Sequence, residues 1–266
     1  MTETTELMRT AESIAREAGD LVRAALGGSV TVAATKSSGV DLVTEVDQAA
    51  ESLIRRRLAE LRPDDGVLGE EEGWQAGSSG LVWIVDPIDG TTNFVYGLPG
   101  YSVSIAVARA EGEDPFSWEL LAGAVHAPAT GQTWSAARGA GAYAEGERIT
   151  IGTPPELATS LVGTGFAYTA ERRAGQAQVL TAVLPRVRDI RRLGSAAMDL
   201  CLVASGALDV FYERYLNPWD MAAGALVVTE AGGVVERVGD GVEGVTVGGP
   251  APLVEELLAV VRPALG

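Results

Sequence analysis

A layered α/β fold is predicted for this chain of 266 residues, and three features of the sequence support the prediction. Apolar residues recur at helical spacing near the N-terminus, two long apolar runs of strand type lie in the middle, and helical and strand patterns alternate in the second half. We expect one compact unit over residues 1–266, with possible subdomains at 1–150 and 151–266 that divide near Pro154 and Pro155.

The first two predicted elements are helices. Residues 5–26 place apolar side chains on one face, and Gly27 and Gly28 end the pattern. The second helix covers residues 44–61, with Thr44 at its N-cap and Asp47 in its first turn. A carboxylate there can bond free backbone N–H groups, so Asp47 has a structural interpretation as a capping residue.

Strands follow in the middle of the chain. Residues 81–86 form an apolar run, and residues 101–110 and 119–127 form two more, separated by a polar turn, which indicates long antiparallel strands. The glycine-rich residues 137–149 are typical of a hairpin. In the second half we expect helices near 170–185, over 195–205, from about Asp220 and from 251, with strands at 208–214 and 232–238.

Composition narrows the possible functions. The net charge of −16 argues against general nucleic-acid binding, and a bound divalent cation would be needed to attract an anionic ligand. No apolar run approaches the roughly 18 residues of a membrane span, and the polar, acidic N-terminus does not resemble a signal peptide. We therefore expect a cytoplasmic protein with no membrane partner.

Histidine and cysteine chemistry is also poorly supported. Cys201 is the single cysteine, so it can build neither an internal disulfide nor a cysteine-rich zinc site. His126 is the single histidine and lies where a predicted strand enters a turn, which favours a surface or strand-edge position over a role in a Ser-His-Asp triad.

The stretch WIVDPIDGTTNF, residues 83–94, contains the strongest chemical signal. If the chain leaves its strand at Asp86 and turns helically through Pro87, Asp86 and Asp89 project to the same side. Two carboxylates about 5 Å apart repel by roughly 3 kcal/mol at an effective dielectric near 20. A hard cation such as Mg²⁺ relieves that repulsion.

An anion site is predicted directly after these acids. Gly90, Thr91 and Thr92 would begin a helix, and the free N–H groups of a helix start bind phosphate. Glu70, Glu71 and Asp220 could complete the acidic cluster. The alternatives are a solvated acidic loop at residues 70–72 and a helix cap at Asn217 or Asp220.

Other phosphate-handling motifs fit less well. Haloacid-dehalogenase-like phosphatases place their acids as D-x-D-G-T, whereas here the acids are three residues apart with a proline between them. The chain has no Walker A sequence and no complete dinucleotide fingerprint.

In these motifs the chain resembles the inositol monophosphatase family of Mg²⁺-dependent, lithium-sensitive phosphatases. The resemblance covers nearly the whole length in order, through VDLVTEVDQAAE at 40–51, GEE at 69–71, the block at 83–107, GSAAMDLCLVASGALDVFYE at 194–213 and WDMAAGALVVTEAGG at 219–233. It implies a five-layer αβαβα sandwich of the inositol monophosphatase and fructose-1,6-bisphosphatase type, usually a homodimer.

The resemblance also implies roles for individual residues. Two or three Mg²⁺ ions would be held by Glu70, Asp86, the carbonyl of Ile88, Asp89 and Asp220. Gly90, Thr91 and Thr92 would bind phosphate, Asp47, Glu70 and Thr91 would orient the attacking water with help from Glu71, and Ala196 and Glu213 would contact substrate hydroxyls. Water would then attack phosphorus directly, without a covalent enzyme intermediate.

The sequence leaves the substrate open. Inositol 1-phosphate is favoured, and fructose 1,6-bisphosphate, NADP, histidinol phosphate and phosphoadenosine phosphate are the alternatives that the same metal core allows. A different class of function is a non-catalytic module that binds metal or phosphate for regulation or assembly. The presence of Asp47, Glu70 and Thr91 argues against it, because a binding module needs no water-activating set.

Overall fold

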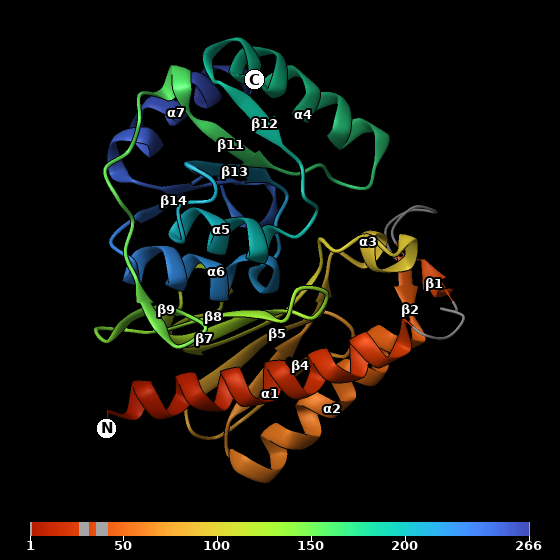
Figure 1. Cartoon of the computed structure of the whole chain (residues 1–266). Coiled ribbons are helices and arrows are strands. Elements are labelled where there is room, and N and C mark those ends of the chain that lie inside the picture. The colour runs from red at the N-terminus through yellow and green to blue at the C-terminus, as the bar shows by residue number, and fades with distance from the viewer. Residues whose placement is uncertain (1, 27–31, 36–41, 266) are drawn as a thin grey trace.

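The computed structural model describes residues 2–26, 32–35 and 42–265, and these residues form five alternating layers of helices and sheets (Figure 1). The predicted αβαβα sandwich is confirmed. The α-helices of the described residues are α1 (Glu3–Ala25), α2 (Glu45–Leu61), α3 (Thr91–Tyr96), α4 (Ala170–Val183), α5 (Ala196–Ala204), α6 (Pro218–Glu230) and α7 (Ala251–Ala264). None of them combines the length and the apolar character needed to cross a lipid bilayer.

The larger sheet has eight strands in the order β10-β9-β8-β7-β6-β5-β3-β4. Its strands are β3 (Gly66–Gly69), β4 (Gly73–Gln75), β5 (Leu81–Asp89), β6 (Ser102–Arg109), β7 (Glu119–Ala127), β8 (Gln132–Ala137), β9 (Gly141–Ala144) and β10 (Glu147–Ile149). Neighbouring strands are antiparallel except β3 and β5, which are parallel. That exception decides where the acidic residues meet.

The smaller sheet has five strands in the order β12-β11-β13-β15-β14. They are β11 (Leu161–Thr164), β12 (Asp189–Arg191), β13 (Val210–Arg214), β14 (Val234–Val238) and β15 (Val245–Gly249). The remaining strands, β1 (Val32–Thr35) and β2 (Leu42–Thr44), form an antiparallel pair.

Three buried apolar clusters hold the layers together. One lies between α1, α2 and the outer face of the large sheet, and a second lies between the inner face of that sheet and the helices α5 and α6. The third packs the small sheet against α4 and α7, as Figure 1 shows at the top of the molecule. Burial of this apolar surface is the main term that stabilises the sandwich.

The predicted elements are largely confirmed, with two kinds of error. Short strands were missed, among them β4, β11, β12 and β15, because three to five residues give too little periodicity to detect. The helical turn expected at Pro87 is wrong. Strand β5 continues to Asp89, and its pairing with β6 contains an irregularity between Asp86 and Asp89. The proposed division at residue 150 stays a prediction.

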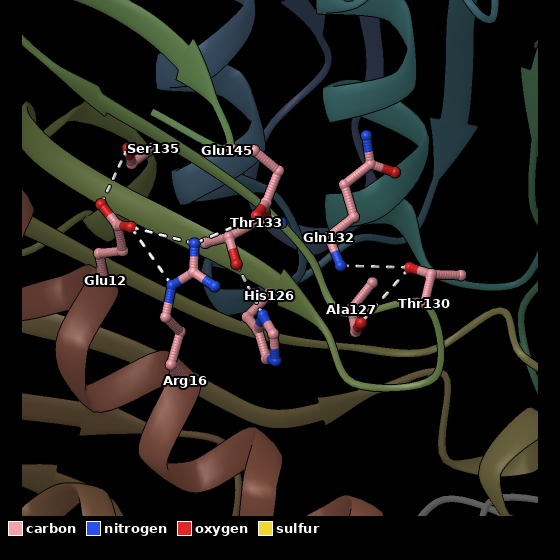
Figure 2. A network of polar contacts seen from close by, with 9 residues as sticks. All are labelled: Glu12, Arg16, His126, Ala127, Thr130, Gln132, Thr133, Ser135 and Glu145. Carbon is pink, nitrogen blue, oxygen red and sulfur yellow. Dashed lines mark hydrogen bonds and ion pairs between the residues drawn. The ribbon is translucent and has the colours of Figure 1, made fainter. Parts of the chain in front are cut away.

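His126 corrects another expectation, because it lies in β7 and is only 6% exposed. Figure 2 shows it beside α1, and its Nδ1 lies 2.7 Å from the Thr133 hydroxyl. Burial lowers the pKa of His126. Nearby, Arg16 of α1 pairs with Glu12 and Glu145, so polar contacts fix the helix on the sheet at this point (Figure 2).

Candidate active site

Two parallel strands bring Glu70 and Asp86 together. In the pairing of β3 with β5, Gly69 lies opposite Val85, so Glu70, the first residue after β3, follows next to Asp86 of β5. The N–H of Glu70 donates to the carbonyl of Val85 at 3.1 Å, which continues the ladder by one residue. Both acids border the same cavity.

A bulge in β5 places Asp89 on the same face as Asp86. Asp86 pairs with Ser104 and Asp89 with Ser102, so three steps on β5 correspond to two on β6. In a regular strand, residues two apart point to the same face and residues three apart to opposite faces. The extra residue in β5 therefore turns the side chain of Asp89 to the face of Asp86. Asp86 Oδ1 also accepts a bond of 3.0 Å from the N–H of Ile88, within the bulge.

Two further acids stand in the first turns of long helices. Asp47 Oδ2 accepts a bond of 2.8 Å from the N–H of Thr44, and Asp220 Oδ2 accepts one of 2.7 Å from the N–H of Asn217. Each completes a capping box at the start of α2 or α6. The capping interpretation is confirmed for both residues, and it does not compete with a role in the site, since one carboxylate oxygen is left over.

Asp89 is tied to the start of α5. Its Oδ2 accepts hydrogen bonds from the hydroxyl of Ser195 at 2.7 Å and from the N–H of Ala197 at 2.8 Å. Ser195 Oγ lies 2.9 Å from the buried hydroxyl of Ser102. Ser195 and Ala197 are contacts of Asp89 that the sequence did not predict, although both lie in the segment GSAAMD, residues 194–199, which carries part of the family resemblance.

Helix α3 begins next to this cluster, as expected. Gly90 is its N-cap with φ of 98°, and a Cβ there would lie 2.7 Å from the carbonyl oxygen of Gly100. Only glycine fits that position. Thr91 Oγ1 lies 3.0 Å from both Asp47 Oδ1 and the carbonyl oxygen of Ile88, so its single proton is shared between two acceptors.

These residues surround a cavity of about 280 Å³ between the edges of the two sheets. Most of the predicted site residues line it, namely Glu70, Asp86, Ile88, Asp89, Gly90, Thr91, Ala196, Glu213 and Asp220. Asp47 lies behind Thr91, and Thr92 and Glu71 are partly buried at positions that do not line the cavity. The mouth also carries Arg172, Arg192 and Arg214, which sequence reasoning missed because isolated arginines have no motif.

Burial and mutual repulsion oppose the ionisation of three acids of this cavity, Asp86, Asp89 and Asp220. Burial, followed by the charges of Glu70, Asp89 and Asp220, raises the pKa of Asp86 well above its usual value. Burial likewise raises the pKa of Asp89 to about 7, and burial followed by the charge of Asp89 raises that of Asp220. Each carboxylate therefore resists the ionisation of the others.

A hard cation fits this donor set. The candidate ligands are all oxygen atoms, and a cation would let the buried acids ionise together. Among the described residues, no three side chains of Asp, Glu, His or Cys form a preassembled cage. Mg²⁺ usually keeps several waters and binds substrate phosphate oxygens, so it does not require a complete cage of protein ligands.

Comparison with known proteins identifies relatives over nearly the whole chain. The model of the inositol monophosphatase family matches residues 3–261. An inositol-1-monophosphatase of Mycobacterium leprae is 45% identical over 252 residues, which cover 87% of this chain and 83% of that protein. A protein of Haemophilus influenzae named Nus factor SuhB is 35% identical over 266 residues, which cover 98% and 97% of the two chains.

The fold is similar to solved structures as well. The inositol monophosphatase of Thermotoga maritima superposes with a TM-score of 0.85 at 32% identity, and the match covers 98% of each chain. The layered architecture and the order of its elements are thus shared along the full length.

Proposed function

Because this chain belongs to the inositol monophosphatase family and is a phosphatase, we propose that it is a Mg²⁺-dependent phosphomonoesterase acting on a small polyol phosphate, inositol 1-phosphate before others. One observation supports this above all: Asp86, Asp89 and Asp220 share a cavity with the first turn of α3. The carboxylates that could bind cations thus lie next to the backbone N–H groups that could bind a phosphate.

The metal ions would be held by oxygen ligands that line this cavity. We assign Glu70, Asp86, the carbonyl of Ile88, Asp89 and Asp220 to them. When bound, two or three Mg²⁺ ions supply an activated water and stabilise the charge on the leaving oxygen. The family expectation of lithium sensitivity belongs to the same proposal.

The phosphate would lie against the start of α3. In the first turn of a helix the N–H groups have no partner within the helix, so those of Gly90, Thr91 and Thr92 are suited to phosphate oxygens. The absence of a Cβ at Gly90 keeps the backbone open to close approach.

The attacking water would be oriented by Thr91 and Asp47. The Thr91 hydroxyl can donate its proton to Asp47, and its oxygen can then accept a hydrogen bond from the attacking water. The N–H of Thr44 donates to Oδ2 of Asp47, and this hydrogen bond fixes the orientation of the Asp47 carboxylate toward Thr91. Glu70 lines the same cavity as Thr91, and Glu71, the next residue in the loop, would help through a water.

Glu213 and the backbone of Ala196 would contact the substrate hydroxyls. Burial raises the pKa of Glu213 to about 8, so near neutral pH this carboxyl can donate one hydrogen bond and accept others. A polyol offers neighbouring hydroxyls that match such a group.

A second substrate class is favoured by the arginines at the mouth. Arg172 and Arg214 stack on the ring of Tyr215 at 4.5 and 4.8 Å, and Arg192 borders the same cavity. A substrate with a second phosphate, such as fructose 1,6-bisphosphate or NADP, would find counter-charges there. Histidinol phosphate carries an ammonium group, which these arginines would repel.

The first experiment is phosphate release from these four esters, with and without Mg²⁺. We expect turnover of inositol 1-phosphate that requires Mg²⁺ and is lost in Asp89→Asn. Equal turnover in EDTA would contradict the metal assignment, and faster turnover of fructose 1,6-bisphosphate or NADP would favour the second substrate class. The Asp89→Asn protein must be shown to fold by circular dichroism.

A regulatory role is the alternative of a different class. The relative named Nus factor SuhB motivates it, as a binding function alongside or in place of hydrolysis. We also propose a homodimer in the cytoplasm, which sedimentation equilibrium and cell fractionation would test. A folded protein that hydrolyses none of the four esters would favour the regulatory alternative.

A further inference from the structure

Helix α2 contains a buried ion pair one turn beyond Asp47. Glu51 is fully buried, and its Oε1 accepts a hydrogen bond of 2.8 Å from Nε of Arg55, whose side chain is only 10% exposed. A buried carboxylate costs free energy unless its oxygens are hydrogen-bonded. The partners of this carboxylate therefore indicate what it holds in place.

The remaining partners of Glu51 are backbone groups of the loop after β3. Its Oε2 accepts from the N–H of Glu71 at 2.8 Å, and its Oε1 accepts from the N–H of Glu72 at 3.0 Å. Arg55 Nη2 donates to the carbonyl of Gly73 at 2.6 Å, at the far end of the loop. The ion pair thus fixes the backbone that directly follows Glu70.

The near end of the loop is packed against the same carboxylate. A Cβ on Gly69 would lie 2.0 Å from Glu51 Oε1, so the backbone of Gly69 approaches the acid closely. Glu70 lies between these two contacts. Its backbone position is therefore set by β5 on one side, through the carbonyl of Val85, and by α2 on the other.

One face of α2 consequently touches two parts of the site. Asp47 and Glu51 are four residues apart and lie on the same face of the helix. Asp47 contacts Thr91, which follows the bulge with Asp86 and Asp89. We propose that Glu51 and Arg55 are positioning residues that hold Glu70 at the distance from this bulge that Mg²⁺ binding needs.

The inference rests on the proposed metal site and adds a specific expectation to it. Residues that orient metal ligands typically change metal affinity by 10–100-fold when they are mutated. Loss of the ion pair should therefore weaken Mg²⁺ binding, while substrate contacts made by α3 and Glu213 stay in place. A purely structural ion pair would change stability alone.

A matched control lies at the other end of β3. Asp65 is 6% exposed and accepts from Arg62 Nε at 2.8 Å, from Ser79 Oγ at 2.6 Å and from Trp83 Nε1 at 2.9 Å. It is a buried acid paired with an arginine that also holds a loop, but it does not line the cavity. Asp65→Asn should lower stability without touching Glu70.

The test is calorimetric titration of the full-length protein with Mg²⁺, for wild type, Glu51→Gln, Arg55→Lys and Asp65→Asn. In Glu51→Gln we expect the Mg²⁺ dissociation constant to rise about 10–100-fold, with the substrate KM at saturating Mg²⁺ within about twofold. Arg55→Lys keeps the charge but loses the planar fork, so a smaller rise is expected, and it replaces Glu51→Gln if that variant does not fold.

Two results would overturn the inference. Either Glu51→Gln and Arg55→Lys bind Mg²⁺ as tightly as wild type, or Asp65→Asn weakens binding as much as they do. If the wild-type protein itself takes up no Mg²⁺, the metal proposal fails, and the positioning role fails with it. The wild-type titration therefore separates the two failures.

Discussion

Asp89→Asn is expected to stabilise the metal-free protein at alkaline pH although it removes a proposed metal ligand. In the fold, burial raises the pKa of Asp89 to about 7 from 3.8. A carboxyl whose pKa is raised by folding lowers the free energy of unfolding when the pH exceeds its pKa in the unfolded chain. The loss is complete once the pH also exceeds its pKa in the folded protein. At 1.36 kcal/mol for each pKa unit, that cost has an upper limit of about 4 kcal/mol at pH 8.

Asparagine removes this cost and keeps the contacts of the side chain. The hydrogen bonds from Ser195 and Ala197 reach one oxygen, Oδ2, and the amide oxygen of asparagine can accept both. We therefore expect a net gain of about 2–4 kcal/mol in the free energy of unfolding at pH 8. At pH 5 less than half of the cost has developed, and near pH 3 it vanishes, because both pKa values then lie above the pH.

Urea denaturation in EDTA at pH 5 and pH 8 measures this difference. The expected result is a stabilised variant whose advantage grows with pH, while turnover with Mg²⁺ is lost. Added Mg²⁺ should reverse the order, since it stabilises only the protein that binds it. A variant less stable than wild type at pH 8, or an advantage independent of pH, would refute the electrostatic reasoning.

Three further substitutions test other parts of the molecule. Thr91→Val removes the hydroxyl that donates toward Asp47 and should lower kcat by about 10²–10⁴-fold, with a small loss of stability, in a phosphate-release assay. An equal loss of Mg²⁺ affinity would argue against its role with water. Gly165→Ala places a Cβ 2.2 Å from Glu213 Oε2, so we expect the KM for inositol 1-phosphate to rise while hydrolysis of p-nitrophenyl phosphate is retained. Gly19→Ala places a Cβ 2.3 Å from the ring of His126. It should destabilise the protein by about 1–3 kcal/mol in urea, despite the roughly 1 kcal/mol helix preference of alanine, and a stabilised variant would show that α1 shifts freely.

Local signals made much of the fold predictable from the sequence. The helices α1 and α2 have long apolar periodicities, and α2 begins directly after the capping residue Thr44, so their positions follow from residues close in the chain. The strands β6 and β7 are long and apolar, so they could also be predicted from the local sequence. Strands such as β11 and β15 are too short to stand out, and only their neighbours in the sheet define them.

The candidate site was predictable as a set of residues but not as a geometry. The spacing of Asp86 and Asp89 indicated acids on one side, yet the cause is a bulge opposite Ser102 and Ser104 rather than a helical turn. The nearness of Glu70 to Asp86 depends on the parallel pairing of β3 with β5, which no local pattern reveals. Glu51 was overlooked because a buried acid on a helix looks like a surface residue until its partners are known.

The capping boxes of α2 and α6 have a consequence for how the site comes into being. Asp47 and Asp220 each bond the backbone at the beginning of a helix, so the contacts that start these helices also orient two carboxylates of the site. Once the first turns of both helices have formed, the carboxylates of Asp47 and Asp220 are already oriented. Formation of these helix starts and orientation of the two acids are then coupled, and unfolding of the first turn of α6 should weaken the proposed metal site, to which Asp220 is assigned, before the rest of the sandwich opens.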